Sequence, residues 1–305
     1  MALATLISCG KDDPVNNNDK PIPIQPGATI EICTSSKAPI TGSNFGTGND
    51  VFRLSAFESE NAPTDWTTSS SNHAFENLAV NSTDGTLTLS TTKYYPLQGK
   101  LWFYAYAPST DNGYTKGSSS SAPTVSYTIT GQEDIMTGKV TSNGFDGKNG
   151  SQPSFTFKHL LQKVTFKVIA DKSFEETDVK VKSIAVTNVK TGAQLNIVTG
   201  ALSFSGDANQ SLTLNKEVSI EKATEQDAGS LMFEPSQTFN ISVTYGESTT
   251  KSLPITLEGD NAGKAGVSHV VTLKFLGAGG GEVNIQPSAT ITEWETGSHI
   301  TTPIQ

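Results

Sequence analysis

The chain has little of the material from which thiol enzymes, zinc proteins and helical membrane proteins are built. Of its 305 residues only two are cysteines, Cys9 and Cys33, and only 17% are charged. Two cysteines leave little scope for thiol chemistry and argue against a zinc site. After residue 10, no stretch offers the roughly 20 consecutive apolar residues that a membrane-spanning helix requires. An attachment to a membrane would therefore need another kind of anchor.

Basic clusters and catalytic motifs are also missing. The formal net charge is -9 and is spread along the chain, which argues against nucleic acid as a partner. The sequence contains no HExxH pair, no GxSxG elbow, no phosphate-binding GxxxxGK loop and no GxGxxG after a strand. We therefore expect no catalytic residue, no metal and no cofactor, and we predict that the protein is not an enzyme.

The adjacent acidic residues and the four histidines are the next candidates for a catalytic role. Glu133 and Asp134 are adjacent, so on a strand they would point to opposite faces and could not act as a facing acid and base. A polysaccharide-active enzyme would need two carboxylates that converge in a cleft, which sequence spacing neither shows nor excludes. For His159 we expect a structural role at a strand start, and we expect the other three histidines to be solvated: His73, His269 and His299.

Short apolar runs separated by turn-forming residues dominate the rest of the chain. Ser, Thr, Asn and Gly lie between runs of Val, Ile, Leu, Phe and Tyr, a composition that favours strands over helices. Val164, Phe166 and Val168 alternate with polar residues, which is the period of a strand. The pattern predicts an all-β protein with antiparallel sheets. Turn-forming residues are densest over 141–153, so we place a boundary between two domains there, at 29–152 and 153–305.

The N-terminus resembles a bacterial lipoprotein signal. Leu6-Ile7-Ser8-Cys9 is similar to a lipobox, which predicts lipidation of Cys9. No Lys or Arg precedes Cys9 and the apolar stretch is short, so the start is assigned too late or the sequence is truncated. Residues 1–28 are interpreted as a signal remnant followed by a flexible tether. Cys33 is interpreted as a small apolar strand residue; a disulfide to Cys9 is the alternative, and lipidation of Cys9 would exclude it.

Several segments together resemble one known family. They are LWFYAYAP from Leu101, GQEDIMTG from Gly131, FKHLLQKVTFKV from Phe157 and SATITEW from Ser288. In this order and spacing they are similar to the fimbrillin family of the Bacteroidetes, whose members build pili. The resemblance implies two tandem transthyretin-like antiparallel β-sandwich domains. It also implies export as a lipoprotein to the outer membrane and the cell surface.

The resemblance further implies assembly by strand exchange. In such families a protease removes the N-terminal strand after a basic residue, and a strand of a neighbouring subunit fills the groove. The removable strand here would be TIEICTS, with Thr29, Ile30 and Ile32 in the polymerisation site. The expected cut lies between Lys37 and Ala38. The family usually has Arg at this place, so an uncleaved anchor, tip or accessory subunit is the alternative.

The C-terminal region would supply the donated strand, with Ile291 and Trp294 as its buried side chains. The alternative is that SATITEW closes the sheet of its own domain. The expected partners are other pilin subunits, the outer membrane through the lipid, and a host glycan or protein.

A second hypothesis is a monomeric surface adhesin that binds carbohydrate or host protein. Tyr104 and Tyr106 share one strand face, and an exposed aromatic row could stack on sugars. The alternative places Trp102, Tyr104 and Tyr106 together in the core.

Overall fold

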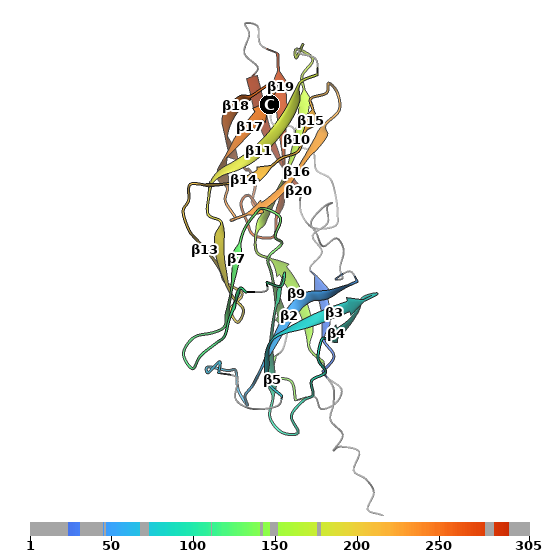
Figure 1. Ribbon diagram of the computed structural model, residues 1–305, viewed down its shortest axis with the longest axis vertical. Helices are drawn as coiled ribbons and strands as arrows, with labels where there is room; N and C mark the ends of the chain where they lie inside the picture. Colours follow the sequence, from blue (N-terminus) through green and yellow to red (C-terminus); the bar gives the residue numbers. More distant parts are fainter. Residues whose placement is uncertain are drawn as a thin grey trace, which may run out of the picture.

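The computed structural model of the chain contains β-strands and no helix in the part that it describes (Figure 1). The all-β class is therefore confirmed. The described residues are 24–30, 45, 47–67, 73–110, 112–140, 143–146, 152–175, 178–277 and 284–292; for 28–30, 284 and 289–292 only the backbone is described. Within these residues no helix is long and apolar enough to cross a membrane.

The first half of the chain forms a seven-stranded sheet. Its strand order is β1-β9-β8-β5-β2-β3-β4, so β1 and β4 are the two edges. The strands are β1 (Gly27–Ile30), β2 (Gly48–Glu58), β3 (Phe75–Thr83), β4 (Thr86–Leu89), β5 (Leu101–Ala107), β8 (Met136–Val140) and β9 (Ser154–His159). The alternation within β5 sends Leu101, Phe103 and Ala105 into a core that this sheet encloses.

Two sheets pack face to face in the second half, in the upper part of Figure 1. One has the order β16-β10-β19-β20 and the other the order β14-β11-β17-β18, with β15 paired to β11. The first comprises β10 (Gln162–Ala170), β16 (Gln226–Phe233), β19 (Ser268–Leu276) and β20 (Asn284–Thr292). The second comprises β11 (Lys180–Val189), β14 (Gln210–Leu214), β15 (Val218–Ser219), β17 (Thr238–Tyr245) and β18 (Thr249–Thr256).

A smaller sheet joins the two halves. Its order is β13-β12-β7-β6, with β6 (Tyr114–Thr115), β7 (Thr124–Thr128), β12 (Gly192–Asn196) and β13 (Leu202–Ser205). Thus β7 pairs with a strand that lies beyond the expected boundary at residue 152, and β8 pairs with β9 across that boundary. The division into 29–152 and 153–305, and the transthyretin-like description of each part, stay predictions.

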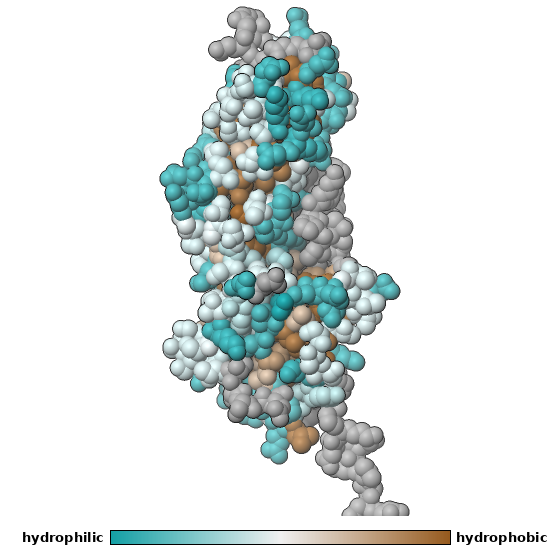
Figure 2. All heavy atoms as spheres, viewed as in Figure 1, coloured by the Kyte–Doolittle hydropathy of each residue, from teal (hydrophilic) through white to brown (hydrophobic). Residues whose placement is uncertain are grey.

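Most pairings are antiparallel, as the sequence predicts, but β1 with β9 and β10 with β19 are parallel. Parallel neighbours need a long connection, and the paired residues in both cases are more than a hundred positions apart along the chain. Alternation within a strand gives no information about which distant strand it will join. The face of the molecule in Figure 2 is mostly hydrophilic or neutral, with hydrophobic patches in its upper and lower halves.

Candidate functional site: the edge strand β1 and the groove beside it

Strand β1 is an edge strand of the seven-stranded sheet. Its four residues pair in parallel with β9, from Gly27 opposite Ser154 to Ile30 opposite Phe157. Among the described strands β9 is its only neighbour, so the outer backbone groups of β1 have no strand partner there. A strand that is paired on one side is the kind of edge at which another strand can add.

The three residues before β1 extend its contact with the sheet. Ile24 is 5% exposed, and its N–H donates to the carbonyl of Lys93 at 2.9 Å. The N–H of Gln25 donates to Oε1 of Gln152 at 2.9 Å, and that of Gly27 donates to the carbonyl of Pro153 at 2.8 Å. Residues 24–30 therefore form one extended segment, which we call the N-terminal edge segment.

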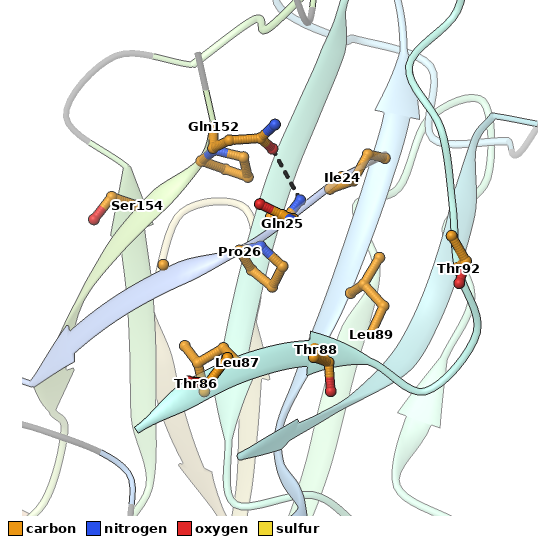
Figure 3. A pocket seen from close by; sticks show the side chains of 12 residues that line it. Ile24, Gln25, Pro26, Thr86, Leu87, Thr88, Leu89, Thr92, Gln152 and Ser154 are labelled. Atoms are coloured by element: carbon orange, nitrogen blue, oxygen red, sulfur yellow. Dashed lines mark hydrogen bonds between the residues drawn. The ribbon is translucent and has the colours of Figure 1, made fainter. Parts of the chain in front are cut away.

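A groove of about 540 Å³ lies beside this segment. It is bounded by Ile24 to Gly27 on one side and by Thr86 to Leu89 of β4 on the other, so both edges of the seven-stranded sheet line it. In Figure 3, Leu87 and Leu89 project from β4 towards Pro26 and Ile24, and the dashed line marks the bond between Gln25 and Gln152. Remaining lining residues are Thr92, Gln152, Pro153 and Ser154.

The core beneath the edge segment is aromatic. The rings of Phe45, Phe52 and Phe157 lie within about 5 Å of one another: 5.1 Å between the centroids of Phe45 and Phe52, 4.9 Å between Phe45 and Phe157, and 5.0 Å between Phe52 and Phe157. Phe155 and Ile24 belong to the same buried cluster. Buried phenylalanine and isoleucine side chains favour an extended partner with apolar residues at alternate positions.

The structure separates the two groups of residues predicted to take part in strand exchange. Thr29 and Ile30 are in β1, where their partners are Thr156 and Phe157. Ile291 is in β20, a strand of a different sheet, opposite His269. Cys9, Ile32, Lys37, Ala38 and Trp294 lie outside the described residues.

The aromatic row of β5 is largely covered. Tyr106 is fully buried, and Trp102 and Tyr104 are half-buried. The ring of Tyr104 lies 5.6 Å from that of Trp66 in an edge-on contact, and burial raises the pKa of Tyr104 to about 12. The indole N–H of Trp102 donates to the carbonyl of Ser59 at 2.9 Å. This strand therefore presents no open aromatic platform of the kind that stacks on sugars.

Glu133, Asp134 and His159 have structural contacts. Glu133 accepts hydrogen bonds from the backbone N–H groups of Thr130 and Gly131, which fixes the turn before β8. Asp134 and His159 are buried, and the carboxylate Oδ1 lies 2.6 Å from Nδ1 of the imidazole. His159 ends β9 rather than starting a strand. This buried contact ties the end of β9 to the segment before β8.

The expectation that His269 is solvated is wrong. Its side chain is fully buried, and neither ring nitrogen has a hydrogen-bond partner among the described residues. Burial in this apolar place lowers its pKa to about 4. The burial of His269 could have been predicted from the alternation of VSHVVTLKF, because His269 shares its strand face with Val271, Leu273 and Phe275, which are buried.

These features define an all-β protein with an edge strand over an aromatic core. A family model described as fimbrillin-like matches residues 37–294, and the chain therefore belongs to the fimbrillin-like family. The family assignment made from the sequence is confirmed.

Solved structures support the fold. The chain is similar to a fimbrial protein of Bacteroides vulgatus, with a TM-score of 0.59, 16% identity and coverage of 90% of this chain and 99% of that one. It is equally similar to a candidate cell adhesion protein of Bacteroides uniformis, with a TM-score of 0.60, 16% identity and coverage of 90% and 99%. It is also similar to a candidate cell adhesion protein of Bacteroides ovatus, with a TM-score of 0.59, 16% identity and coverage of 92% of this chain and 100% of that one. No curated protein matches the sequence.

Proposed function

We propose that this protein is a structural subunit of a cell-surface fimbria and that it joins its neighbours by strand exchange at β1. The observation that carries the proposal is the geometry of the N-terminal edge segment. It is paired on one side among the described strands, and the apolar core beneath it would be left open if the segment were removed. Membership of the fimbrillin-like family and the fimbrial structures with the same fold support this role.

Removal of the segment would require a cut between Lys37 and Ala38, as the sequence analysis predicts. Arg53 is the next basic residue after Lys37, but it lies within β2, and its guanidinium donates to the carbonyl of Asn77 at 3.0 Å. A protease needs an extended, accessible backbone, so a residue inside a paired strand is a poor site. We also propose that lipid on Cys9 attaches the exported subunit to the outer membrane.

Limited trypsin digestion of the full chain tests the exchange. We expect mass spectrometry to show a new N-terminus at Ala38 and light scattering to show growth of filaments or ladders that resist mild denaturant. The matched control is Lys37→Gln, which should stay uncut at this position and monomeric. If the wild-type chain is cut at Lys37 and still remains monomeric, strand exchange at β1 is wrong and an adhesin that acts alone becomes the better account.

A further inference from the structure

The sequence of the N-terminal edge segment occurs a second time near the other end of the chain. Residues 24–30 read IQPGATI, and residues 285–291 read IQPSATI. Six of the seven positions are identical, and the two copies differ only at Gly27 and Ser288. The second copy lies within β20, which we call the C-terminal edge strand.

The two copies occupy corresponding kinds of place. The first copy consists of edge strand β1 and the three residues before it, next to β9, and the second lies within edge strand β20, next to β19. The first isoleucine is buried in both, with Ile24 at 5% and Ile285 at 3% exposure. The glutamine that follows is exposed in both. Pro26 directly precedes β1 and Pro287 lies within β20, where a proline is tolerated because an edge strand does not need every N–H for a neighbour.

The backbone requirements of the β1 position match the second copy. At that position, hydrogen bonds are donated by the N–H groups of residues 24, 25 and 27, and Pro26 donates none. Ile285, Gln286 and Ser288 have the N–H groups that these bonds need, and Pro287 takes the place where no donor is required. The three bonds that anchor the start of the N-terminal edge segment can therefore be formed by the C-terminal copy.

The single difference between the two copies also fits. A Cβ added at Gly27 would lie 3.6 Å from Oγ and 3.8 Å from Cβ of Ser154, which are ordinary van der Waals contacts. The backbone of Gly27 is not in the left-handed region that would make a side chain unfavourable. A serine can thus stand at this position without moving β9.

We propose that the strand which replaces β1 is β20 of a second copy of this chain, in the register that places Ile285 at the position of Ile24 and Ile291 at that of Ile30. The inference rests on the proposed function and makes it specific, because it names the partner as the same protein and fixes the donor at residues 285–291. The donor begins three residues earlier than the segment expected from the sequence.

The repeat also explains why removal of β1 would be needed. When donor and resident strand have almost the same sequence, the groove binds either one with nearly equal affinity. A resident strand on the same chain competes at an effective concentration of the order of millimolar, about a thousand times that of a micromolar partner. The intact chain therefore keeps its own β1, and cleavage removes this advantage.

Donation of β20 to another subunit requires that it first separate from its own sheet. β20 pairs with β19 over nine residues, so it must leave this strand before it can enter another subunit. Thr272 and Ser288 lie opposite each other in that pair. A disulfide in the variant Thr272→Cys/Ser288→Cys should hold β20 in place and block assembly, and reduction should restore it.

Cross-linking tests the register. Both chains carry Cys9→Ser, Cys33→Ser and a specific protease site between Lys37 and Ala38. One has Ser154→Cys, because Ser154 lies opposite Gly27, and the other has Ser288→Cys. After cleavage, mixing and mild oxidation, we expect a disulfide between residues 154 and 288 in a mixed dimer. The matched control has Gln286→Cys in place of Ser288→Cys, which puts the thiol two residues out of register. We expect it to form at least tenfold less of the disulfide-linked mixed dimer.

The outcomes separate this inference from the function on which it rests. Assembly with the 154–288 cross-link supports both. Assembly without the cross-link, or with equal cross-linking of residue 286, overturns the proposed register and donor and leaves strand exchange intact. Cleavage without any assembly overturns strand exchange itself.

Discussion

The two edge strands β1 and β20 have almost the same sequence, yet the protein holds them differently. β1 pairs in parallel over four residues, whereas β20 pairs antiparallel over nine. Parallel pairing is slightly less stable per residue, so the direction of pairing makes β1 the weaker of the two over the described residues. The sequence of an edge strand therefore does not determine how firmly it is held. The neighbouring strand and the direction of the pairing contribute as well.

The largest loss of stability is expected when a phenylalanine is truncated in the core beneath either strand. Phe52→Ala should destabilise the first half by about 3 to 5 kcal/mol, because the ring is fully buried among three other phenylalanines. Phe275→Ala should have a similar cost in the second core. Only Phe52→Ala should speed hydrogen exchange in the N-terminal edge segment. Equal acceleration by both variants would show that the two cores unfold together.

Truncation of the matching isoleucines compares the strands directly. Ile24→Ala and Ile285→Ala each remove a buried side chain, and each should cost about 2 to 4 kcal/mol in its own half. Because β1 is held by parallel pairing and Ile24 anchors its start, Ile24→Ala should release it and expose its backbone to protease, while Ile285→Ala leaves β20 paired. Limited proteolysis with mass spectrometry measures this. Release of β20 by Ile285→Ala would contradict the ranking of the two strands.

The pH dependence of stability should come from the half that contains β20. His269 has a folded pKa of about 4, below its unfolded value, so the unfolded chain binds more protons between these values. Stability should be complete above about pH 6.5 and fall by roughly 1 to 3 kcal/mol as the pH decreases towards 4. Urea unfolding at several pH values checks this. His269→Leu should remove this part of the loss, and an unchanged profile would show that His269 does not cause it.

The smallest effect is expected for the substitution that makes the two copies identical. Gly27→Ser should change stability by less than about 0.5 kcal/mol, because the added Cβ meets only ordinary contacts with Ser154. The double variant Gly27→Ser/Ser154→Ala is the control, because it removes the hydroxyl of Ser154 that the new side chain would contact. A loss of more than about 2 kcal/mol would mean that serine does not fit in this position, and it would weaken the case for β20 as the donor.

Strand positions could be predicted from the sequence, whereas strand neighbours could not. The run LWFYAYAP became β5, and SATITEW lies largely within β20, because alternation and β-branched residues are local signals. The pairing of β1 with β9 joins residues more than 120 positions apart and has no local signature. The buried state of His269 was readable from the alternation of its strand, but a histidine without a partner is unusual in a core.

The two strands of the candidate site could be predicted from the sequence, but the residues before β1 could not. The first strand and the C-terminal strand were both identified from the family resemblance, and Thr29, Ile30 and Ile291 lie in them. The contribution of Ile24 and Pro26 was missed, because proline-rich sequence was interpreted as a tether. Their burial depends on β4 and on Lys93, which approach from elsewhere in the chain.

Peptide binding tests the central claim, that β1 and β20 are interchangeable in the groove. A fluorescent peptide of residues 284–292 is added to the chain cut between Lys37 and Ala38, and its anisotropy is followed while unlabelled competitors are titrated. We predict binding of one peptide per cut chain and none to the intact chain. Unlabelled peptide 24–30 should displace it at a concentration within tenfold of that of peptide 285–291, and a scrambled peptide should not. Displacement by the scrambled peptide, or failure of peptide 24–30 to compete, would contradict the claim.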